Sequence, residues 1–452
     1  METAMQNDLI DQLNADTKEK RLTAVRELKK LIGSGEISMP EKQGYTNNHV
    51  HTTYSFSPYS PTKAVWIALA SGLSTVGIID HDAINGAEEF IEAGEILGLP
   101  TTIGFELRTD WSNTKLSGKR INNPDQVSSA YICAHGLPHT QIKNADKYLR
   151  TIRTAREKRS RAITAKLNDM MRPHGIVIDY DMDVIPLSCA ADGGEITERH
   201  ILFALAHKMI QKHGRGQALI DFLKIPLALK LSDTQKTLLG DTQCDIYAYD
   251  LLNVLKGGFV SQIYIDSTTD ETPDVREAVK AIKSWGAIPS YCYLGDVAAS
   301  PTGDKKAQTF EDAYLEDVFE ECKAIGFNAI AFMPSRNTIE QTDRVMKLCD
   351  KYGFMQISGE DINQPRQSFI CKQLKDERFL HLIDTTWALV GHEKAASQDL
   401  QNGMFADGAQ LSPRQMNERI AKYKRIGLEE SRHKLLKHII RRGQISHRTA
   451  HL

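Results

Sequence analysis

Two histidines separated by one valine, His49 and His51, stand in the stretch HVHTTYSFSPYSP near the start of the chain. On an extended strand, residues two apart point to the same side, so both imidazoles would meet at one point. Imidazole nitrogens are common ligands of divalent metals. An HxH pair also arises by chance on protein surfaces, so the rest of the chain has to distinguish these two interpretations.

More histidines and carboxylates follow other apolar runs that we expect to form strands. They are His81 and Asp82 after 75–80, Glu106 in 100–107, His135 in 128–136, and Asp361 at the end of 354–361. The carboxyl ends of the strands in a parallel α/β barrel share one rim, where function collects. The sequence therefore predicts a metal site at this rim, and ligands of His with Asp or Glu suit Zn, Mn or Fe.

The apolar runs alternate with amphipathic helices, and this alternation positions the polar residues. Later runs lie at 259–266, 287–294, 328–333 and 354–361, and Gly257-Gly258 predicts a turn before the first of these. The stretch SPTKAVWIALASG combines Ser60 as N-cap with Pro61 at the first helical position. Strand, helix and strand in repetition predict a parallel sheet, and about seven strands favour a closed or nearly closed barrel.

Five segments are expected. Residues 1–44 form an N-terminal helical extension, 45–139 the first part of the barrel, and 258–412 its second part. Between the two, 140–257 is a mostly helical insertion that caps one rim, and 413–452 is a basic helical tail. The insertion carries an arginine-rich run on a helix, and its members Arg156 and Arg159 are candidates to bind a phosphate. The segment ITERHILFAL carries Arg199 and His200, which could reach the rim, and Arg199 is a further candidate to bind a phosphate.

Composition limits the partners. The chain has 452 residues and a formal net charge of −2, so no overall field draws it to nucleic acid or membrane. No apolar run has the length of a membrane span, and the N-terminus lacks the order of a signal peptide. The seven cysteines have no CxxC spacing and are expected to be reduced. These features predict a cytoplasmic protein, and they leave the oligomeric state open.

The motifs HVHTTYS, IIDHDAINGAEEF, TIGFEL and SGED resemble, in order and spacing, those of the PHP (polymerase and histidinol phosphatase) family of metal-dependent phosphoesterases. The resemblance covers roughly residues 45–363. It implies a distorted (β/α)7 barrel, with helical insertion and extensions, that holds up to three metal ions and hydrolyses phosphate esters. The helical insertion is similar to that of the branch that acts on nucleotide phosphates.

Residue by residue, the resemblance gives an incomplete ligand set. His49, His51, His81, Glu106 and Asp361 match metal ligands, with Glu106 as the bridging carboxylate. Phe56 stands where the family has aspartate, Tyr131 and Tyr291 where it has histidine, and Asn363 where a terminal histidine is expected. His135, a short distance after Tyr131, and Asn363 are retained as weaker candidate ligands. One or two divalent ions (Mn, Zn, Fe or Mg) are therefore expected in place of three.

Two functions of different classes follow. The leading hypothesis is a metal-dependent phosphoesterase for a small nucleotide or sugar phosphate, in which Asp82 or His200 handles the leaving-group proton and Tyr291 orients substrate or water. The alternative is a catalytically degenerate barrel that binds a ligand or partner, since several ligands are replaced. Nuclease action on oligonucleotides is a third interpretation, which the arginines favour and the near-neutral net charge does not.

Overall fold

The computed structural model describes residues 4–297, 309–409 and 411–429. Seven strands form one sheet in the order of the chain: β1 (Thr46–Val50), β2 (Thr75–His81), β3 (Thr101–Asp110), β4 (Ser129–His135), β5 (Ile288–Cys292), β6 (Ala329–Phe332) and β7 (Met355–Ser358). A parallel bridge between Val50 and Ile362 brings the chain after β7 back to β1. The sheet is thus a nearly closed barrel, which confirms the predicted fold class.

The prediction that every strand is parallel is wrong for β4. This strand pairs antiparallel with both β3 and β5, while the remaining neighbours pair parallel. The connection from β3 to β4, residues 111–128, contains no helix and turns back through a backbone hydrogen bond from Trp111 N to Ser128 O of 2.8 Å. A parallel neighbour needs a long crossover, usually a helix, and this loop supplies none.

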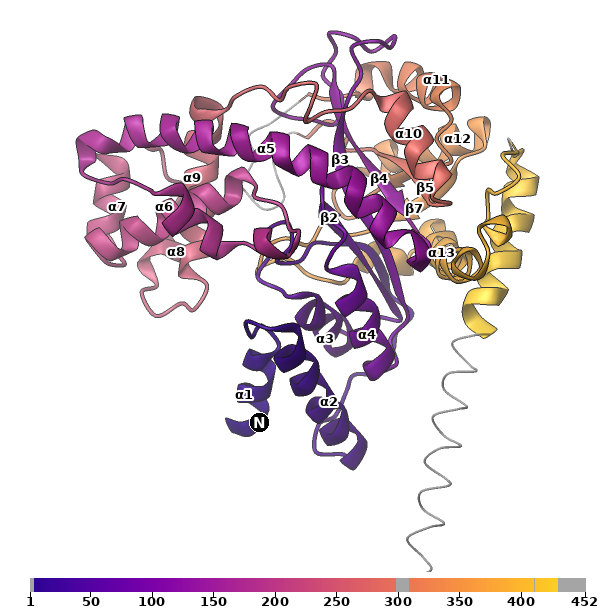
Figure 1. The fold of residues 1–452 in the computed structure, drawn as a ribbon, viewed down its shortest axis with the longest axis horizontal. Coiled ribbons are helices and arrows are strands. Elements are labelled where there is room, and N and C mark those ends of the chain that lie inside the picture. The colour runs from indigo at the N-terminus through magenta and orange to yellow at the C-terminus, as the bar shows by residue number, and fades with distance from the viewer. Residues whose placement is uncertain (1–3, 298–308, 410, 430–452) are drawn as a thin grey trace, which may run out of the picture.

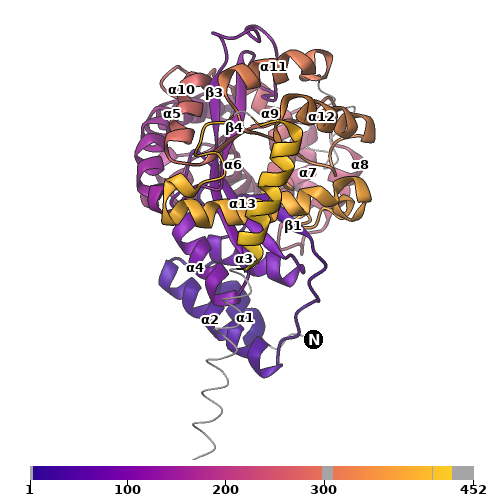
Figure 2. The ribbon, with the colours of Figure 1, turned by 90° about the vertical axis from the view of Figure 1, so that its right-hand side faces the viewer.

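Helices surround the barrel on its outer face (Figure 1, Figure 2). They are α3 (Pro61–Ala70), α4 (Ala87–Leu97), α10 (Val275–Ser284), α11 (Leu315–Ile325), α12 (Ile339–Tyr352) and α13 (Leu380–Gln398). The start of α3 follows its sequence signal, because the Ser60 side chain accepts a hydrogen bond from Lys63 N and Pro61 begins the helix. Helix α13 lies across the amino ends of the strands, where Glu393 accepts from Ile103 N at 2.7 Å.

Two terminal extensions pack on this body. Helix α2 (Lys18–Ser34) lies against α3 and α4, helix α1 (Ala4–Gln12) packs on α2, and the Arg21 guanidinium pairs with Glu89 at 2.6 Å. Residues 413–429 are helical and lie beside α13 (Figure 2). The remainder of the predicted basic tail, 430–452, lies outside the described residues. None of the described helices is both long and apolar enough to cross a membrane.

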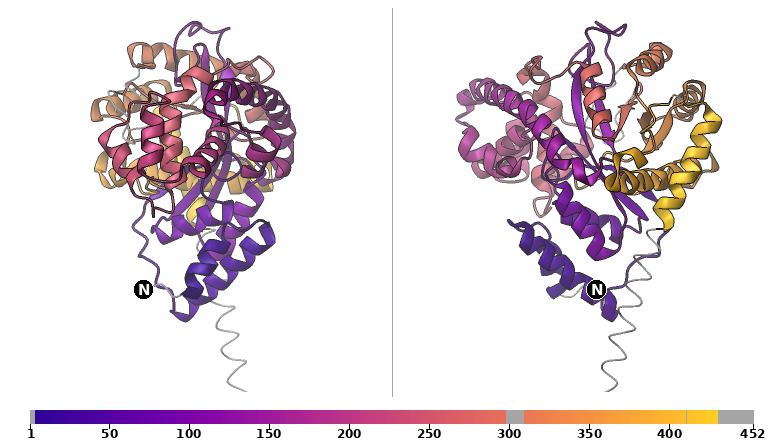
Figure 3. Two further views of the ribbon diagram at one scale, coloured as in Figure 1. Left: turned by 90° about the vertical axis from the view of Figure 1, so that its left-hand side faces the viewer. Right: turned by 45° about the vertical axis from the view of Figure 1, so that its right-hand side comes forward.

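The helical insertion forms a lobe to one side of the barrel (Figure 1; Figure 3, right). It comprises α5 (Ile142–Met171), α6 (Glu198–His213), α7 (Gln217–Lys224), α8 (Asp233–Gly240) and α9 (Tyr247–Ile263), which enclose an apolar core of their own. The predicted strand 259–266 and the turn before it are wrong. Leu251, Leu255, Phe259 and Ile263 recur every four residues and are all buried, so one apolar helical face runs through Gly257-Gly258.

Candidate metal centre

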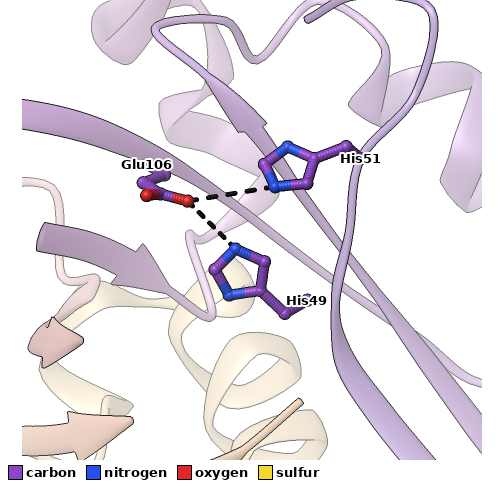
Figure 4. A group of neighbouring side chains, drawn as sticks. All are labelled: His49, His51 and Glu106. Atoms are coloured by element: carbon purple, nitrogen blue, oxygen red, sulfur yellow. Dashed lines mark hydrogen bonds and ion pairs between the residues drawn. The ribbon is translucent and has the colours of Figure 1, made fainter. Parts of the chain in front are cut away.

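His49 at the end of β1, His51 directly after this strand and Glu106 in β3 meet at the carboxyl rim of the barrel. His49 Nε2 lies 3.0 Å and His51 Nε2 lies 3.9 Å from the same carboxylate oxygen, Glu106 Oε2. One ligand atom from each of the three residues lies within 4.8 Å of the other two, and Figure 4 shows the side chains pointing toward one another. The two histidines therefore converge on one point.

Asp361 and His81 adjoin this group. Asp361 Oδ1 lies 3.2 Å from His51 Nε2, and His81 Nδ1 lies 3.9 Å from Glu106 Oε2. The rings of His51 and His81 stack with centroids 4.6 Å apart. Asn363 donates from Nδ2 to Asp361 Oδ1 at 2.6 Å, so it orients the aspartate from the side. All the residues that match the PHP ligand motifs thus lie on one part of the rim.

The electrostatic environment differs between the histidines. Burial opposes protonation of His49, but its hydrogen bond to Glu106 and the charges of Glu106 and Asp361 outweigh burial and raise its pKa to about 9. Burial, followed by the charge of His51, holds the pKa of His81 well below its usual value, so His81 is neutral. For Asp361, burial alone would raise the pKa, but its hydrogen bond with His51 and the neighbouring positive charges lower it strongly.

A hydroxyl and a buried carboxylate fix the orientation of His51. The ring nitrogen Nδ1 lies 3.2 Å from Ser55 Oγ, and Ser55 donates to Asp80 Oδ1 at 2.6 Å. Asp80 also accepts from the Thr52 backbone N at 2.7 Å and from its hydroxyl at 2.6 Å. Such outer hydrogen bonds leave the opposite ring nitrogen directed at a metal. Sequence reasoning quoted these residues within the motifs HTTYS and IIDHD but assigned them no role.

The donor set fits a divalent metal. Ligand bonds of about 2.0–2.2 Å at tetrahedral angles place neighbouring donors about 3.3–3.6 Å apart. The separations of 3.0, 3.2 and 3.9 Å between histidine nitrogens and carboxylate oxygens bracket that range. The imidazoles of His49 and His51 face the carboxylates of Glu106 and Asp361 at these distances. His49, His51, Glu106 and Asp361 would therefore hold one ion with small movements, and His81 lies beside it.

His135 lies next to this group, inside the barrel. It is 2% exposed, lines the same pocket, and its Nε2 atom has no hydrogen-bond partner among the described residues. Burial and the charge of His49 lower its pKa to about 3, so the ring is neutral. A buried imidazole nitrogen without a partner is costly unless something binds it. His135 thus has the properties of an auxiliary ligand, although it is outside the group of three.

A pocket of about 280 Å³ opens from the metal centre toward the helical lobe. The barrel contributes His49, Glu106 and Asp361 to its wall, and the lobe contributes Glu198 and Arg199 at the start of α6 together with part of α9. Arg199 Nη1 donates to Asn363 Oδ1 at 2.5 Å, which links the lobe to the rim. Arg199 therefore lines the same pocket as His49 and Glu106, and its role toward a phosphate stays a prediction.

Two other residues that were predicted to bind phosphate, Arg156 and Arg159, form buried ion pairs away from the pocket. Arg156 Nη1 pairs with Asp82 Oδ2 at 2.6 Å and Arg159 Nε pairs with Glu271 Oε2 at 2.6 Å, all four side chains being buried. These residues do not line the pocket. The same ion pair removes Asp82 from the proposed proton-transfer role, because the carboxylate faces a guanidinium in the protein interior. These three assignments are corrected accordingly.

His200 and Tyr291 also lie away from the pocket. His200 is 1% exposed, and its Nδ1 accepts from Thr197 N at 3.0 Å, so it caps α6; burial foremost lowers its pKa to about 3. Phe56, expected on the same rim, instead packs edge-on against His200 within the lobe. Tyr291 donates to Glu311 Oε1 at 3.0 Å and contacts Trp111 on the outer face of the sheet. The roles predicted for His200 and Tyr291 are therefore corrected.

Strand alternation explains the error at Tyr291 and identifies residues that sequence reasoning did not place. On β4, Tyr131, Cys133 and His135 share one face, and pocket lining by Tyr131 and His135 shows that this face is turned inward. On β5, Cys292 lines the pocket, so its neighbour Tyr291 points outward. Tyr131, whose ring lies 5.7 Å from that of His81, is the pocket tyrosine.

No protein-family model matches the chain. It is 29% identical over 152 residues to a 5'-3' exoribonuclease of Haemophilus influenzae, which covers 34% of this chain and 47% of the relative. Error-prone DNA polymerases of Corynebacterium diphtheriae and Cutibacterium acnes match at 38% over 77 residues and 40% over 65, covering 17% and 14% of this chain but only 7% and 6% of the polymerases. The matches thus span about half of the exoribonuclease and a small part of each polymerase.

Two solved structures are similar to the chain at low identity. A Bifidobacterium adolescentis protein assigned as a metal-dependent phosphoesterase has a TM-score of 0.48 and 19% identity over 75% of this chain and 94% of its own. An amidohydrolase from Chromobacterium violaceum has a TM-score of 0.47 and 16% identity over 72% of this chain and 90% of its own.

The barrel, the His and Glu cluster at its rim and the sequence relatives agree with the motifs: the fold is PHP-like. The chain is a distant homologue of the exoribonuclease and of the error-prone polymerases.

Proposed function

We propose that the protein hydrolyses a phosphate ester of a small substrate, a nucleotide or sugar phosphate, with one or two divalent metal ions at the rim of the barrel. The observation that carries this proposal is the convergence of His49, His51 and Glu106 within 4.8 Å at the inner end of a pocket. Metal ligands that open onto a pocket of ligand size are expected for a hydrolase rather than for a structural metal site.

His49, His51, Glu106 and Asp361 would hold the first ion, and His81 and His135 are the remaining imidazoles near it. A bound divalent ion lowers the pKa of a coordinated water and polarises a phosphoryl oxygen. The chain contributes fixed ligand orientation, since Ser55 and Asn363 hold His51 and Asp361 through hydrogen bonds of 3.2 and 2.6 Å. Pre-arranged ligands of this kind need little reorganisation when substrate binds.

Arg199 is the group proposed to bind the substrate phosphate. A guanidinium carries five N–H donors, and the contact with Asn363 uses one nitrogen of the group, Nη1. Arg199 stands in the first turn of α6, whose amino end adds a partial positive charge. The planar donor arrangement suits two oxygens of one phosphate at once. This role replaces those expected of Arg156 and Arg159.

Two residues that line the pocket, Glu198 and Tyr131, can hydrogen-bond to the substrate where Asp82 and His200 cannot. Burial alone would raise the pKa of Glu198, but nearby guanidinium groups, Arg156 foremost, lower it to about 2, so Glu198 is a carboxylate that accepts hydrogen bonds. Burial, the main cause, raises the pKa of Tyr131 far above neutrality, so its hydroxyl stays protonated and can donate. We assign to Tyr131 the hydrogen bond to the leaving-group oxygen.

The test is hydrolysis of a panel of nucleotide and sugar phosphomonoesters by the purified protein loaded with Mn²⁺. Release of inorganic phosphate that requires the metal and is abolished in His49→Ala and Glu106→Gln is the expected result. If the metal-loaded protein releases no phosphate from the panel while it binds one of the compounds, the degenerate barrel that binds a ligand replaces the enzyme.

Removal of residues from RNA ends is a second candidate, favoured by the similarity to the 5'-3' exoribonuclease over 152 residues. Short 5'-phosphorylated RNA belongs in the same panel for this reason. Nuclease activity predicts that shortened products appear and that binding weakens steeply with salt, because contacts to several phosphates release counterions. A preference for mononucleotides, with binding little affected by salt, would support the small-substrate function.

A further inference from the structure

Two cysteines on neighbouring strands lie in contact beneath the metal centre. The sulfur atoms of Cys133, in the middle of β4, and Cys292, the last residue of β5, are 3.1 Å apart. The antiparallel pairing of these strands sets Cys133 opposite Ser290, two residues before Cys292, so both thiols are on the same face. No other two cysteines of the described chain have sulfur atoms in hydrogen-bonding distance.

Each of the two thiols also lies near one of the proposed metal ligands. Cys133 is the residue directly opposite Glu106 in the ladder between β3 and β4. Cys292 is half-buried and lines the pocket together with His49, whereas Cys133 is buried behind it. A small reagent that enters the pocket therefore reaches Cys292 first, and Cys133 is placed to react second.

We propose that Cys133 and Cys292 are a redox modification site: a peroxide oxidises them to a disulfide, and this bond weakens metal binding at the adjacent centre. The Cys292 thiolate attacks one oxygen of hydrogen peroxide and the O–O bond breaks. Cys292 becomes a sulfenic acid, and the departing hydroxide is protonated to water. The Cys133 sulfur then attacks the sulfenic sulfur and a second water leaves with the thiol proton. Two thiols and one hydrogen peroxide thus give one disulfide and two waters.

Bond formation requires a local movement of the strands. A disulfide is about 2.05 Å long, so the two sulfur atoms must approach by about 1 Å. Cys292 ends its strand and can move toward β4, while Cys133 is held in the middle of its ladder. A diagonal pair across antiparallel strands is a strained position for a disulfide, and strained disulfides are readily reduced. The expected bond is therefore reversible, and its formation displaces the pocket wall at Cys292, which lines the pocket together with His49.

The experiment treats the metal-free full-length protein with hydrogen peroxide, maps disulfides by mass spectrometry of peptides, and measures Mn²⁺ binding by calorimetry. We expect a bond between Cys133 and Cys292, an affinity for Mn²⁺ reduced at least fivefold, and recovery of both after treatment with dithiothreitol. The variants Cys133→Ser and Cys292→Ser should retain the affinity of the reduced protein after peroxide. Cys189→Ser, which changes a half-buried cysteine outside the pocket, should respond like the wild type.

Absence of the Cys133–Cys292 bond overturns the proposal, as does a bond that forms without changing the affinity for Mn²⁺. Loss of affinity in the Cys292→Ser variant under peroxide would assign the effect to oxidation elsewhere and would also contradict it. None of these readouts depends on phosphate release. The redox proposal can therefore be wrong while the phosphoesterase proposal is right, and the phosphoesterase proposal can be wrong while the redox proposal is right.

Discussion

Two clusters of charged residues lie where the barrel meets the helical lobe, and they differ in how their charges are compensated. The metal centre holds imidazoles against carboxylates at the pocket. The second cluster, which we term the arginine network, consists of Asp82, Arg108, Arg156, Arg159, Glu195 and Glu271. In the arginine network, Arg156 meets Asp82 at 2.6 Å, and Glu271 accepts from Arg159 at 2.6 Å and from Arg108 at 3.1 Å.

The difference lies in the cations. Guanidinium groups keep their charge at all ordinary pH values, so Asp82 and Glu271 face partners that stay charged. Imidazoles lose their proton easily, and a histidine that releases it can coordinate a metal. Similar carboxylates at neighbouring strand ends, Asp82 after β2 and Glu106 in β3, therefore acquire different roles. The arginine network joins lobe to barrel, and the metal centre can bind an ion.

The largest effect is expected from breaking the arginine network with Arg156→Met. The substitution leaves Asp82 buried without its partner, and removal of one member of a buried ion pair costs about 3–5 kcal/mol. Urea unfolding of the metal-free protein measures this loss. Arg150→Met, which removes a pair with Asp146 from an arginine side chain that is 71% exposed, is the control and should cost less than about 1 kcal/mol. A small loss in Arg156→Met would show that the two clusters do not differ as described.

The complementary change is His49→Ala. We expect the affinity for Mn²⁺ to fall by more than about 100-fold, because even residues behind the ligands contribute 10–100-fold. The free energy of unfolding of the metal-free protein should change by only about 1 kcal/mol. Calorimetry and urea unfolding give both quantities, with the exposed His381→Ala as control. Unaltered Mn²⁺ affinity in His49→Ala would refute the ligand assignment.

The pH dependence separates the clusters without mutation. The folded-state pKa of His49 is raised to about 9, above its usual 6.5. Its ion pair therefore stabilises the metal-free protein fully below pH 6.5, and this contribution is lost as the pH rises through 9. Since a metal needs the neutral ring, the affinity for Mn²⁺ should rise about tenfold per pH unit between 6.5 and 8.5. In His49→Ala both slopes should disappear; a pH-independent affinity in the wild type would contradict this assignment.

The smallest effect is expected at the pocket tyrosine. Tyr131→Phe removes the hydroxyl proposed to contact the leaving group and should lower kcat roughly tenfold while Mn²⁺ affinity is unchanged. Tyr291→Phe is the matched control: its hydroxyl contacts Glu311 on the outer face of the sheet, so the substitution should affect stability and leave kcat as it is. Steady-state kinetics on the best phosphomonoester decide between the two tyrosines, and the opposite pattern would restore Tyr291 to the site.

Sequence reasoning reached the barrel and the residues on its rim because both depend on short-range patterns. Strand runs, helix caps and the positions of His49 and His51 at the end of β1 and of Glu106 within β3 are encoded locally. The direction of β4 was not predictable in this way, because a loop of 18 residues between β3 and β4 carries no sign of whether it crosses over or turns back. The helix through Gly257-Gly258 was missed because two glycines outweighed a regular apolar spacing.

The errors among the site residues have one physical cause: a side chain's partner is set by distant parts of the chain. Arg156 and Asp82 are 74 residues apart, and Arg159 and Glu271 are 112 apart, so neither ion pair is visible as a motif. Tyr291 was placed by its position in a motif, although a shift of one residue along a strand reverses the side that a residue faces. Arg199 and Asn363, 164 residues apart, are joined by a hydrogen bond at the pocket that both residues line.

The most direct measurement is anomalous X-ray diffraction from crystals of the wild-type protein soaked in Mn²⁺. The account predicts an anomalous peak at the rim, at about 2.2 Å from His49 Nε2, His51 Nε2 and a Glu106 oxygen, with Asp361 completing the site. It also predicts no such peak in the arginine network. Full-occupancy Mn²⁺ bound elsewhere, with these three side chains still paired to one another, would contradict the central claim.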